Sequence, residues 1–273
     1  MLDPLLKETA PLLQGQVADV SSPRWPTASP EGTPASNGIK VIIFDKDGTL
    51  FDFQATWAAW CISMIEAEAG GDQILGGQLA AALGYDPVSR RFQPDSVIAE
   101  PTEVMAERLL PLLPGARKAE VVARMNQLAA AAPQIEAAPL KGLLTSLADW
   151  GVRLGLATSD VEASTRAHLR TAGVEDLFDS IICLDSGWGA KPQPGQLLAV
   201  TRALGVSPDH CVMVGDSLHD LHAARAAGMI AVAVLTGLTA RETLEPVADV
   251  VLDSIKDLPG WIAAQRGRAT LSQ

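Results

Sequence analysis

Short apolar runs that alternate with helix-like stretches constrain the fold of this chain more than any other feature. The clearest run is Val41 to Phe44, which is continuously apolar and is followed at once by Asp45. A run of this kind is typical of a strand that is buried on both faces of a sheet. Further runs of the same character cover residues 153–158, 181–184, 211–215 and 230–235, with a weaker one at 249–252.

The stretches between these runs have the spacing of helices, and two of them are followed by a glycine, Gly151 and Gly173, where helices often end. Strands that alternate with helices predict parallel βαβ units. We therefore expect an α/β protein with a doubly wound, Rossmann-like parallel sheet and helices on both of its faces. The predicted helices cover residues 140–150, 161–172, 196–204 and 218–227.

Residues 53–138 break this alternation, because they are rich in Ala, Leu, Glu and Met and contain no convincing strand. They predict an inserted all-α cap domain, placed directly after the first strand. An insertion at this point lies above the carboxyl ends of the strands, where open α/β sheets bind ligands, so it could act as a lid. The α/β core is then expected to comprise residues 39–52 and 139–265.

The two ends of the chain are expected to stand outside these domains. Within residues 1–38, the stretch 21–38 holds four prolines, Pro23, Pro26, Pro30 and Pro34, among Ser, Thr and Gly, without apolar periodicity. Such a stretch cannot offset the entropy cost of ordering itself, so it predicts a flexible leader. Residues 266–273 are expected to form a short tail.

Composition excludes several classes of partner and location. The chain of 273 residues has 32 acidic and 21 basic side chains and a net charge of −11, which would repel nucleic acid and anionic membranes. Its three cysteines form no CxxC pair, which fits a reducing compartment better than a disulfide framework. The start of the chain lacks a signal-peptide pattern, and the longest apolar stretch, near residues 229–238, is too short to span a bilayer. We expect a cytoplasmic protein.

The segment Asp45-Lys46-Asp47-Gly48-Thr49-Leu50 carries the strongest chemical signal. It places two carboxylates, Asp45 and Asp47, at the tip of the first buried strand, and Gly48 allows the backbone to curl close to a ligand. Asp and Gly also form ordinary turns, so a strand-ending turn is the alternative interpretation.

This segment resembles the first motif of the haloacid dehalogenase superfamily, and the other three motifs follow in the family's order. Residues 154–158 resemble the second, an apolar strand that ends in the hydroxyl residue Thr158. Lys191-Pro192 resembles the third, and residues 214–220, a strand followed by Asp216 and Asp220, resemble the fourth. The resemblance covers about residues 39–252, places the insertion where the family carries a helical cap, and is greatest to the phosphoglycolate phosphatase branch.

The resemblance implies a role for each of these side chains. Asp45 would attack phosphorus and form an aspartyl-phosphate, and Asp47 would donate a proton to the leaving alcohol and later take one from water. Thr158, Lys191 and the backbone N–H groups around Asp47 and Gly48 would bind phosphate oxygens. Asp45, the backbone carbonyl of Asp47, and Asp216 would hold Mg²⁺, and Asp220 would orient Lys191 or a metal-bound water.

Simple electrostatics supports the need for two cations. A carboxylate that approaches a phosphate dianion meets a repulsion of roughly 8 kcal/mol at an effective dielectric constant near 20. That would slow the step by about five orders of magnitude or more. Mg²⁺, which prefers hard oxygen ligands, is one answer. Lys191, the only lysine between Lys141 and Lys256, is the other.

Each of these residues also has a purely structural interpretation. Thr158 could simply end a strand, Lys191 could be a solvated loop lysine, Asp216 could cap the following helix, and Asp220 could lie on a helix surface. Asp160 is expected to cap the helix that follows it.

Other candidate residues are expected to have no catalytic role. His219 and His222 stand three residues apart on a predicted helix, but no further zinc ligands lie near them in the sequence. Cys183 and Cys211 fall in predicted strands and are expected to be core residues.

Within the superfamily, the sequence favours a hydrolase of phosphate esters. The leaving alkoxide of an ester needs the proton that Asp47 can supply, whereas a departing halide needs none. A phosphonate-cleaving relative would use a lysine of the cap, where this chain has only Lys118. Sugar phosphomutases usually carry Glu-Asp in the fourth motif, where this chain has Gly215-Asp216.

The leading prediction is a Mg²⁺-dependent phosphatase for a small phosphorylated metabolite, with a phosphoglycolate-like ester as the first candidate. A sugar phosphomutase and a catalytically silent binding protein with the same fold remain as alternatives. Two departures leave the subfamily open: Phe53 stands where a small hydroxyl residue is common, and Gly195 where an acid often follows Pro194.

Overall fold

The sheet that the sequence predicts is present in the computed structural model, which describes residues 38–93, 96–100 and 102–270. Six parallel strands pair in the order β5-β4-β1-β6-β7-β8. Each predicted strand is confirmed, with bounds that differ by at most two residues. The strands are β1 (Val41–Phe44), β4 (Arg153–Ala157), β5 (Ser180–Ile182), β6 (Cys211–Gly215), β7 (Ile230–Val234) and β8 (Val250–Leu252).

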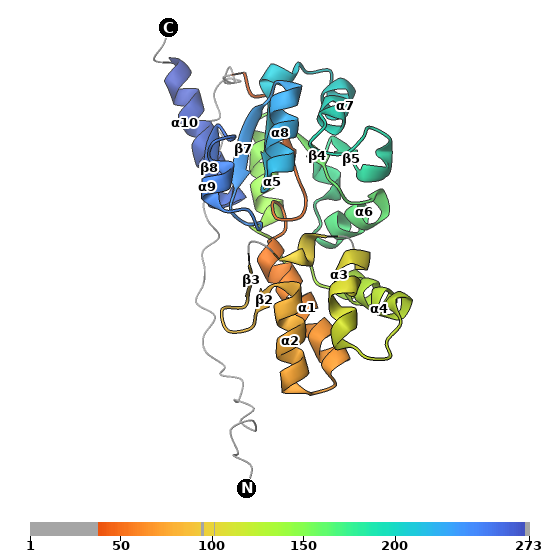
Figure 1. Cartoon of the computed structure of the whole chain (residues 1–273). Helices are drawn as coiled ribbons and strands as arrows, with labels where there is room; N and C mark the ends of the chain where they lie inside the picture. The colour runs from red at the N-terminus through yellow and green to blue at the C-terminus, as the bar shows by residue number, and fades with distance from the viewer. Residues whose placement is uncertain (1–37, 94–95, 101, 271–273) are drawn as a thin grey trace, which may run out of the picture.

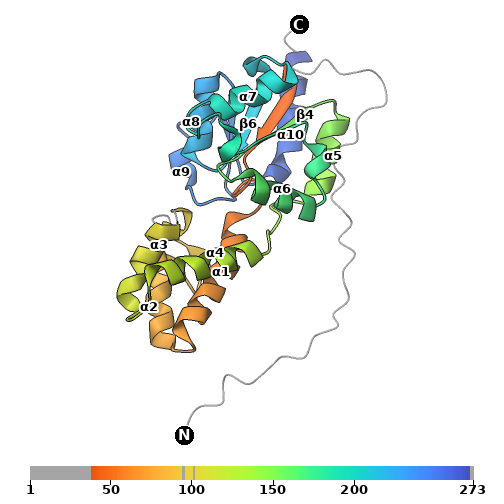
Figure 2. The same ribbon diagram turned by 90° about the vertical axis from the view of Figure 1, so that its right-hand side faces the viewer.

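Helices cover both faces of this sheet, as Figure 2 shows. Alternate residues of a strand point to opposite faces. Ile42 and Phe44 therefore pack against one layer of helices, while Val41 and Ile43 pack against the other. The first layer contains α5 (Leu140–Asp149), α6 (Glu162–Thr171) and α10 (Leu258–Thr270), and the second contains α7 (Gly195–Leu204), α8 (Leu218–Ala227) and α9 (Arg241–Leu244).

The glycines predicted to end helices do so. The chain turns at Gly151 after α5 and at Gly173 after α6, with φ of 77° and 67°. Gly195 starts α7 so close to the carbonyl of Trp188 that a Cβ would lie 1.9 Å from its oxygen. This contact explains why Gly195 stands at a position where an acidic residue is expected.

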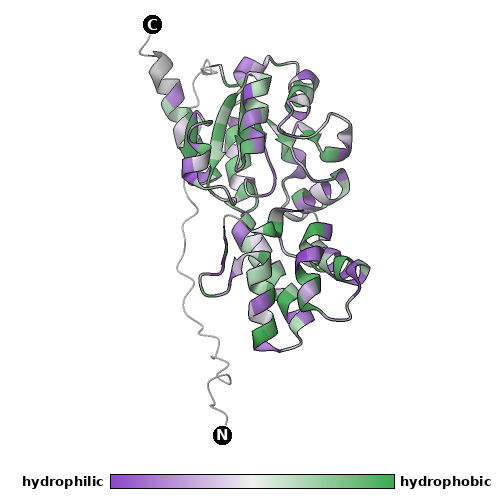
Figure 3. Cartoon of the chain, viewed as in Figure 1, coloured by the Kyte–Doolittle hydropathy of each residue, from purple (hydrophilic) through white to green (hydrophobic). Residues whose placement is uncertain are grey.

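The insertion forms a second group of helices, which lies below the sheet and its helices in Figure 1. Its helices are α1 (Phe53–Ala69), α2 (Gln73–Leu83), α3 (Thr102–Leu109) and α4 (Lys118–Ala131). They enclose a hydrophobic cluster of their own around Trp60, Met64 and Met125. Figure 3 shows apolar residues toward the interior of the sheet with its helices and toward the interior of the insertion, with polar residues toward the outside of both. We propose that residues 53–138 are the cap domain and that residues 39–52 with 139–265 are the core.

The insertion is not entirely helical, which differs from the prediction. Strands β2 (Tyr85–Asp86) and β3 (Arg91–Phe92) form a short antiparallel hairpin. The carboxylate of Asp86 accepts hydrogen bonds from the Val88 backbone N–H and the Ser89 hydroxyl, and so fixes the turn. Two-residue strands leave no periodic pattern in the sequence, so only the folded turn reveals them.

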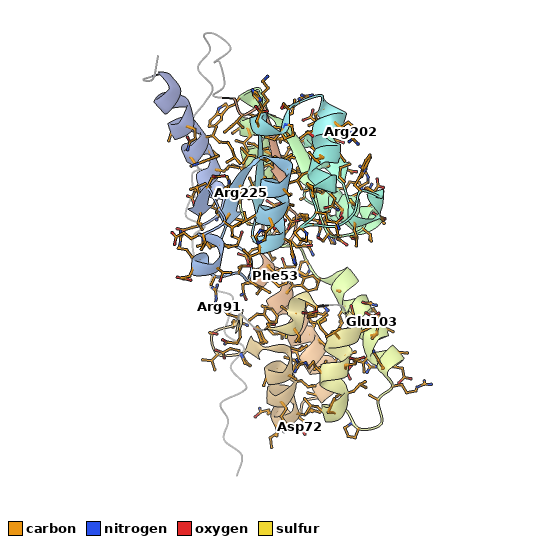
Figure 4. All side chains as sticks on the ribbon, turned by 45° about the horizontal axis from the view of Figure 1, so that its top comes forward. Phe53, Asp72, Arg91, Glu103, Arg202 and Arg225 are labelled. Carbon is orange, nitrogen blue, oxygen red and sulfur yellow. The ribbon has the colours of Figure 1, made fainter. Side chains whose placement is uncertain are left out.

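Two adjacent segments connect the insertion to the sheet. The Asp52 N–H donates to the Ile135 carbonyl at 2.7 Å, and the Ala137 N–H donates to the Leu50 carbonyl at 2.9 Å. Figure 4 places Phe53 at this junction, and Asp72 at the far end of the insertion. The connection thus brings the first residues of α1 close to the carboxyl ends of the strands.

The predicted leader falls outside the described residues, except for Gly38, and so do the last three residues of the predicted tail. The backbone of residues 266–270 continues helix α10. Within the described part of the chain, no helix combines the length and the apolar character needed to cross a membrane.

We expect Gly155→Ala to destabilise the fold by about 1–3 kcal/mol, because the new Cβ would lie 2.7 Å from Val200 Cγ1 between β4 and α7. Gly77→Ala is the matched control, since nothing lies within 4 Å of its added Cβ in α2. That substitution should stabilise the protein by about 0.5–1 kcal/mol. Urea unfolding of both variants measures the two effects, and an unchanged Gly155→Ala variant would contradict the packing described.

Candidate active site

Asp45 stands at the carboxyl end of β1, between its two neighbouring strands β4 and β6. Its backbone N–H donates to the Val214 carbonyl of β6 at 2.9 Å. The chain then turns sharply, because the N–H groups of Leu50 and Phe51 both donate to the Lys46 carbonyl. This turn holds the residues of the first motif at the edge of the sheet where the other motifs also end.

Lys191 joins three of the motifs. Its Nζ donates to Asp45 Oδ1 at 2.7 Å, to Asp220 Oδ1 at 2.6 Å and to the Ala157 carbonyl at 3.0 Å. The side chains of Lys191 and Asp220 are almost completely buried. Both residues are therefore parts of one buried ion-pair network, and their interpretation as a solvated lysine and a surface acid is wrong.

Asp220 is held from two sides. Its Oδ2 accepts hydrogen bonds from the backbone N–H and the hydroxyl of Ser217, which begins α8, while Oδ1 accepts from Lys191. With both oxygens engaged, Asp220 fits the predicted task of orienting Lys191.

Asp216 follows β6 and, with Asp45 and Asp220, forms a group whose carboxylate atoms lie within 4.8 Å of one another. It forms no ion pair with any cation among the residues described here. Two glycines leave room for it: a Cβ at Gly237 would lie 1.7 Å from Asp216 Oδ2, and one at Gly48 2.4 Å from Asp216 Cγ. The free oxygen of Asp45 and the carboxylate of Asp216 are a hard donor set that fits Mg²⁺.

The pKa values of Asp45 and Asp216 are raised because these acids are buried close to one another. Burial raises the pKa of Asp45 to about 7, although Lys191 opposes the shift. Burial, together with the charges of Asp220 and Asp45, raises the pKa of Asp216 well above its usual range. The pKa of Lys191 is raised by its two carboxylate partners, which outweigh its burial. A divalent cation would relieve the repulsion that remains between Asp45 and Asp216.

Thr158 directly follows β4 beside this cluster and is buried. Its Oγ1 accepts a hydrogen bond from the Asp160 N–H, so the hydroxyl proton is left to donate. Gln196 on α7 donates to the Thr158 carbonyl at 3.0 Å and holds the backbone in place. The position of Thr158 suits the predicted contact with a phosphate oxygen.

Gly48 differs from its predicted role. Its N–H donates to the Phe51 carbonyl at 2.8 Å and is not directed to a ligand, and its carbonyl accepts from the Thr236 hydroxyl at 2.6 Å. The backbone turns there with φ of 80°, and the missing Cβ makes room for Asp216. Gly48 therefore shapes the acidic cluster rather than presenting a donor.

Sequence reasoning missed the residues around Asp47. Lys46 Nζ lies 2.7 Å from Asp47 Oδ1, 3.2 Å from His168 Nδ1 and 3.4 Å from Asp160 Oδ2. Asp160 also accepts from the Val161 N–H and the Ser164 hydroxyl. The expectation that Asp160 caps α6 is wrong, because Val161 is the N-cap residue and no side chain caps this helix. The one local signal was a lysine between two motif acids; His168 lies 122 positions away from it and could not be paired with it from the sequence.

Four further candidate residues lie outside the acidic cluster of Asp45, Asp216 and Asp220. His219 and His222 are exposed on α8. Cys183 and Cys211 are buried and free, and burial raises the pKa of both thiols.

A cavity of about 930 Å³ extends from the carboxyl ends of β1 and β4 to the insertion. Asp45, Asp47 and Thr158 line its base, while Lys191 and Asp216 lie outside its lining. The insertion contributes an aromatic wall in which Phe53 contacts Trp57 at 5.9 Å and Trp57 contacts Trp60 at 5.8 Å between ring centroids. The site can therefore hold a small molecule with one anionic end at the sheet and the rest against the insertion.

Comparison with known proteins agrees with this geometry. The model of the haloacid dehalogenase-like hydrolase family matches residues 39–228. The phosphoglycolate phosphatase of Nitrosospira multiformis is 29% identical over 220 residues, which are 80% of this chain and 92% of that protein. The pyrophosphatase PpaX of Bacillus pumilus is 31% identical over 122 residues, 44% of this chain and 56% of that protein.

Solved structures show the same fold at lower identity. The hydrolase YfnB of Bacillus subtilis, solved with bound magnesium, aligns with a TM-score of 0.63 at 19% identity and covers 82% of this chain and 98% of its own. The β-phosphoglucomutase of Clostridium difficile aligns with a TM-score of 0.54 at 19% identity and covers 85% of this chain and 99% of its own.

The raised pKa of Asp45 predicts a pH-dependent loss of stability in metal-free protein. At pH 4 the carboxyl is mostly protonated in the folded state, so wild type and Asp45→Asn should have similar free energies of unfolding. As the pH rises from 3.8 to about 7, the unfolded chain releases this proton and the folded state keeps it. The variant should then become more stable than wild type, by an amount on the order of 3 kcal/mol.

Urea unfolding in EDTA at pH 4 to 8 measures this difference, with the exposed Asp149→Asn as control. A difference that does not change with pH would contradict the buried, neutralised state of Asp45.

Gly237→Ala should weaken Mg²⁺ binding by about 10-fold or more, because the new methyl group would displace the Asp216 carboxylate. Titration calorimetry with MgCl₂ measures the dissociation constant, and Gly77→Ala serves as control. An unaltered constant would show that Asp216 is not a ligand.

Proposed function

The chain belongs to the haloacid dehalogenase-like hydrolases, and we propose that it is a Mg²⁺-dependent phosphatase for a small phosphate monoester. The observation that carries this proposal is the Lys191 bridge between Asp45 and Asp220 at the strand ends, with Asp216 beside it and Asp47 two residues after Asp45. This arrangement provides a nucleophilic carboxylate, a cation beside it and a second carboxyl group for proton transfer.

In the proposed first step, an oxygen of Asp45 forms a bond to phosphorus while the ester P–O bond breaks. Asp47 gives its proton to the departing alcohol oxygen, so the products are the free alcohol and an aspartyl-phosphate at Asp45. Thr158 and Lys191 bind phosphoryl oxygens and reduce their repulsion from Asp45.

In the second step, water attacks the phosphorus and Asp47 takes its proton. The bond between phosphorus and Asp45 breaks, which restores the carboxylate and releases inorganic phosphate. One ester and one water are thereby converted to one alcohol and one phosphate. Asp45, Asp216 and the Asp47 carbonyl would hold Mg²⁺, which when bound offsets negative charge on the phosphoryl group.

Phosphoglycolate is the first substrate that we propose to test, because a relative with similar length carries that activity in its name. Pyrophosphate is the second substrate to test, because another relative, PpaX, is named a pyrophosphatase. It ranks second because PpaX matches a smaller share of this chain. The alternative of a sugar phosphomutase is disfavoured by Gly215: a Cβ there would lie 2.3 Å from Asp220 Cβ, so a glutamate does not fit before Asp216.

Asp45→Asn should lower phosphate release by roughly a thousandfold or more, and EDTA should abolish the wild-type rate until Mg²⁺ is restored. The assay measures inorganic phosphate released from phosphoglycolate, pyrophosphate, sugar phosphates and nucleotides, with Asp149→Asn as the matched control. Normal turnover by Asp45→Asn would eliminate the mechanism. A folded wild type that is inert on every ester would instead support a silent binding protein.

A further inference from the structure

Lys46 is a buried charge in a place where an apolar side chain would cost less. Its side chain is 1% exposed, and an ammonium removed from water destabilises a fold unless its protons are all satisfied. The residue lies between Asp45 and Asp47, which the proposed mechanism uses, yet that mechanism gives it no task.

The ammonium is held by three protein groups. It forms hydrogen bonds with Asp47 Oδ1 at 2.7 Å and His168 Nδ1 at 3.2 Å, and an ion pair with Asp160 Oδ2 at 3.4 Å. Because an ammonium only donates, Nδ1 of His168 must accept and its ring must be neutral. Burial and the charge of Lys46 lower the pKa of His168, which agrees with that state. The ammonium of Lys46 is therefore directed to Asp47, His168 and Asp160.

Two of the three partners are anchored elsewhere. Asp160 is held by the Val161 N–H and the Ser164 hydroxyl, and the His168 ring packs edge-on against Phe51 with centroids 6.4 Å apart. The third partner, Asp47, is 31% exposed, and within the described residues Lys46 is the one side chain that binds its carboxylate.

We propose that Lys46 is a positioning residue for Asp47, an inference that rests on the phosphatase function proposed above. The ammonium, fixed by Asp160 and His168, holds Oδ1 of Asp47 and leaves Oδ2 for the leaving oxygen or the attacking water. Such alignment matters because a general acid or base must lie within hydrogen-bond reach of the proton that it transfers. Lys46 thus acts through Asp47 and does not itself touch the ester.

The test uses leaving groups that differ in their need for a proton. The 4-nitrophenolate leaving group of 4-nitrophenyl phosphate departs without a proton, so formation of the aspartyl-phosphate from it does not depend on Asp47. An alkyl phosphate needs the proton in that step. Return of the enzyme to its free state needs Asp47 for both esters, because water must be deprotonated.

In Lys46→Met we expect a nitrophenolate burst whose rate stays within about threefold of wild type, followed by steady turnover that is slower by about 10- to 100-fold. Single-turnover cleavage of the alkyl ester should fall by a similar 10- to 100-fold. Lys118→Met is the matched control: it removes a lysine from an ion pair with Glu107 on the insertion and should leave all these rates unchanged.

His168→Leu provides a second, milder variant if Lys46→Met does not fold. It removes one anchor of the ammonium and should lower alkyl-ester cleavage more than the nitrophenolate burst. If either folded variant slows the burst as much as the alkyl reaction, Lys46 acts on the whole site and the proposal is overturned.

A crystal structure of Lys46→Met gives a readout that does not depend on activity. We expect the Asp47 carboxylate to rotate or to lose its single position. An Asp47 carboxylate that keeps its place would overturn the proposal whatever the rates. If wild type cleaves neither ester, the phosphatase function fails, and the structure of the variant still decides whether Lys46 positions Asp47.

Discussion

The Lys191 ammonium lies between two buried carboxylates, and the rest of the candidate site is arranged around it. Asp45 is 146 positions away from Lys191 in the chain, and both side chains are almost fully withdrawn from water. A buried charge of this kind is destabilising when alone, so each of these groups depends on the others being in place. The parallel pairing of β1 with β4 and β6 brings their strand ends to one edge and makes this contact possible.

Close packing around the acids is the second constraint. Gly48, Gly215 and Gly237 each stand where a Cβ would overlap Asp216 or Asp220. The three glycines, Gly215 at the end of β6 and the other two in loops, let the backbone approach the carboxylates directly, and so keep Asp45 and Asp216 together despite their mutual repulsion. The raised pKa values of these two acids are the electrostatic consequence, and a divalent cation is the chemistry that the arrangement suits.

Two buried lysines offset the negative charge of the acids in this site. Lys191 faces Asp45 and Asp220 at the base, and Lys46 faces Asp47 and Asp160 on the side of α6. The cavity extends from Asp45 and Asp47 to the insertion, which contributes its aromatic wall together with the acidic side chains of Glu100 and Glu103. In the reaction proposed above, the strand ends would provide the reacting groups, and the insertion would provide much of the surface that the organic part of a substrate touches.

The sequence by itself determined the α/β class, the approximate strand ends and the acids that follow them, because a continuous apolar run and the position of a residue after it are local properties. It did not reveal the β2–β3 hairpin, whose strands are too short to show a period. Nor did it show that the Gly48 N–H is used by Phe51, or that Lys46 meets His168 and Asp160. Only the tertiary structure decided these contacts, because they depend on how α6 lies beside the turn after β1 and on which atoms that tight turn brings within hydrogen-bond distance.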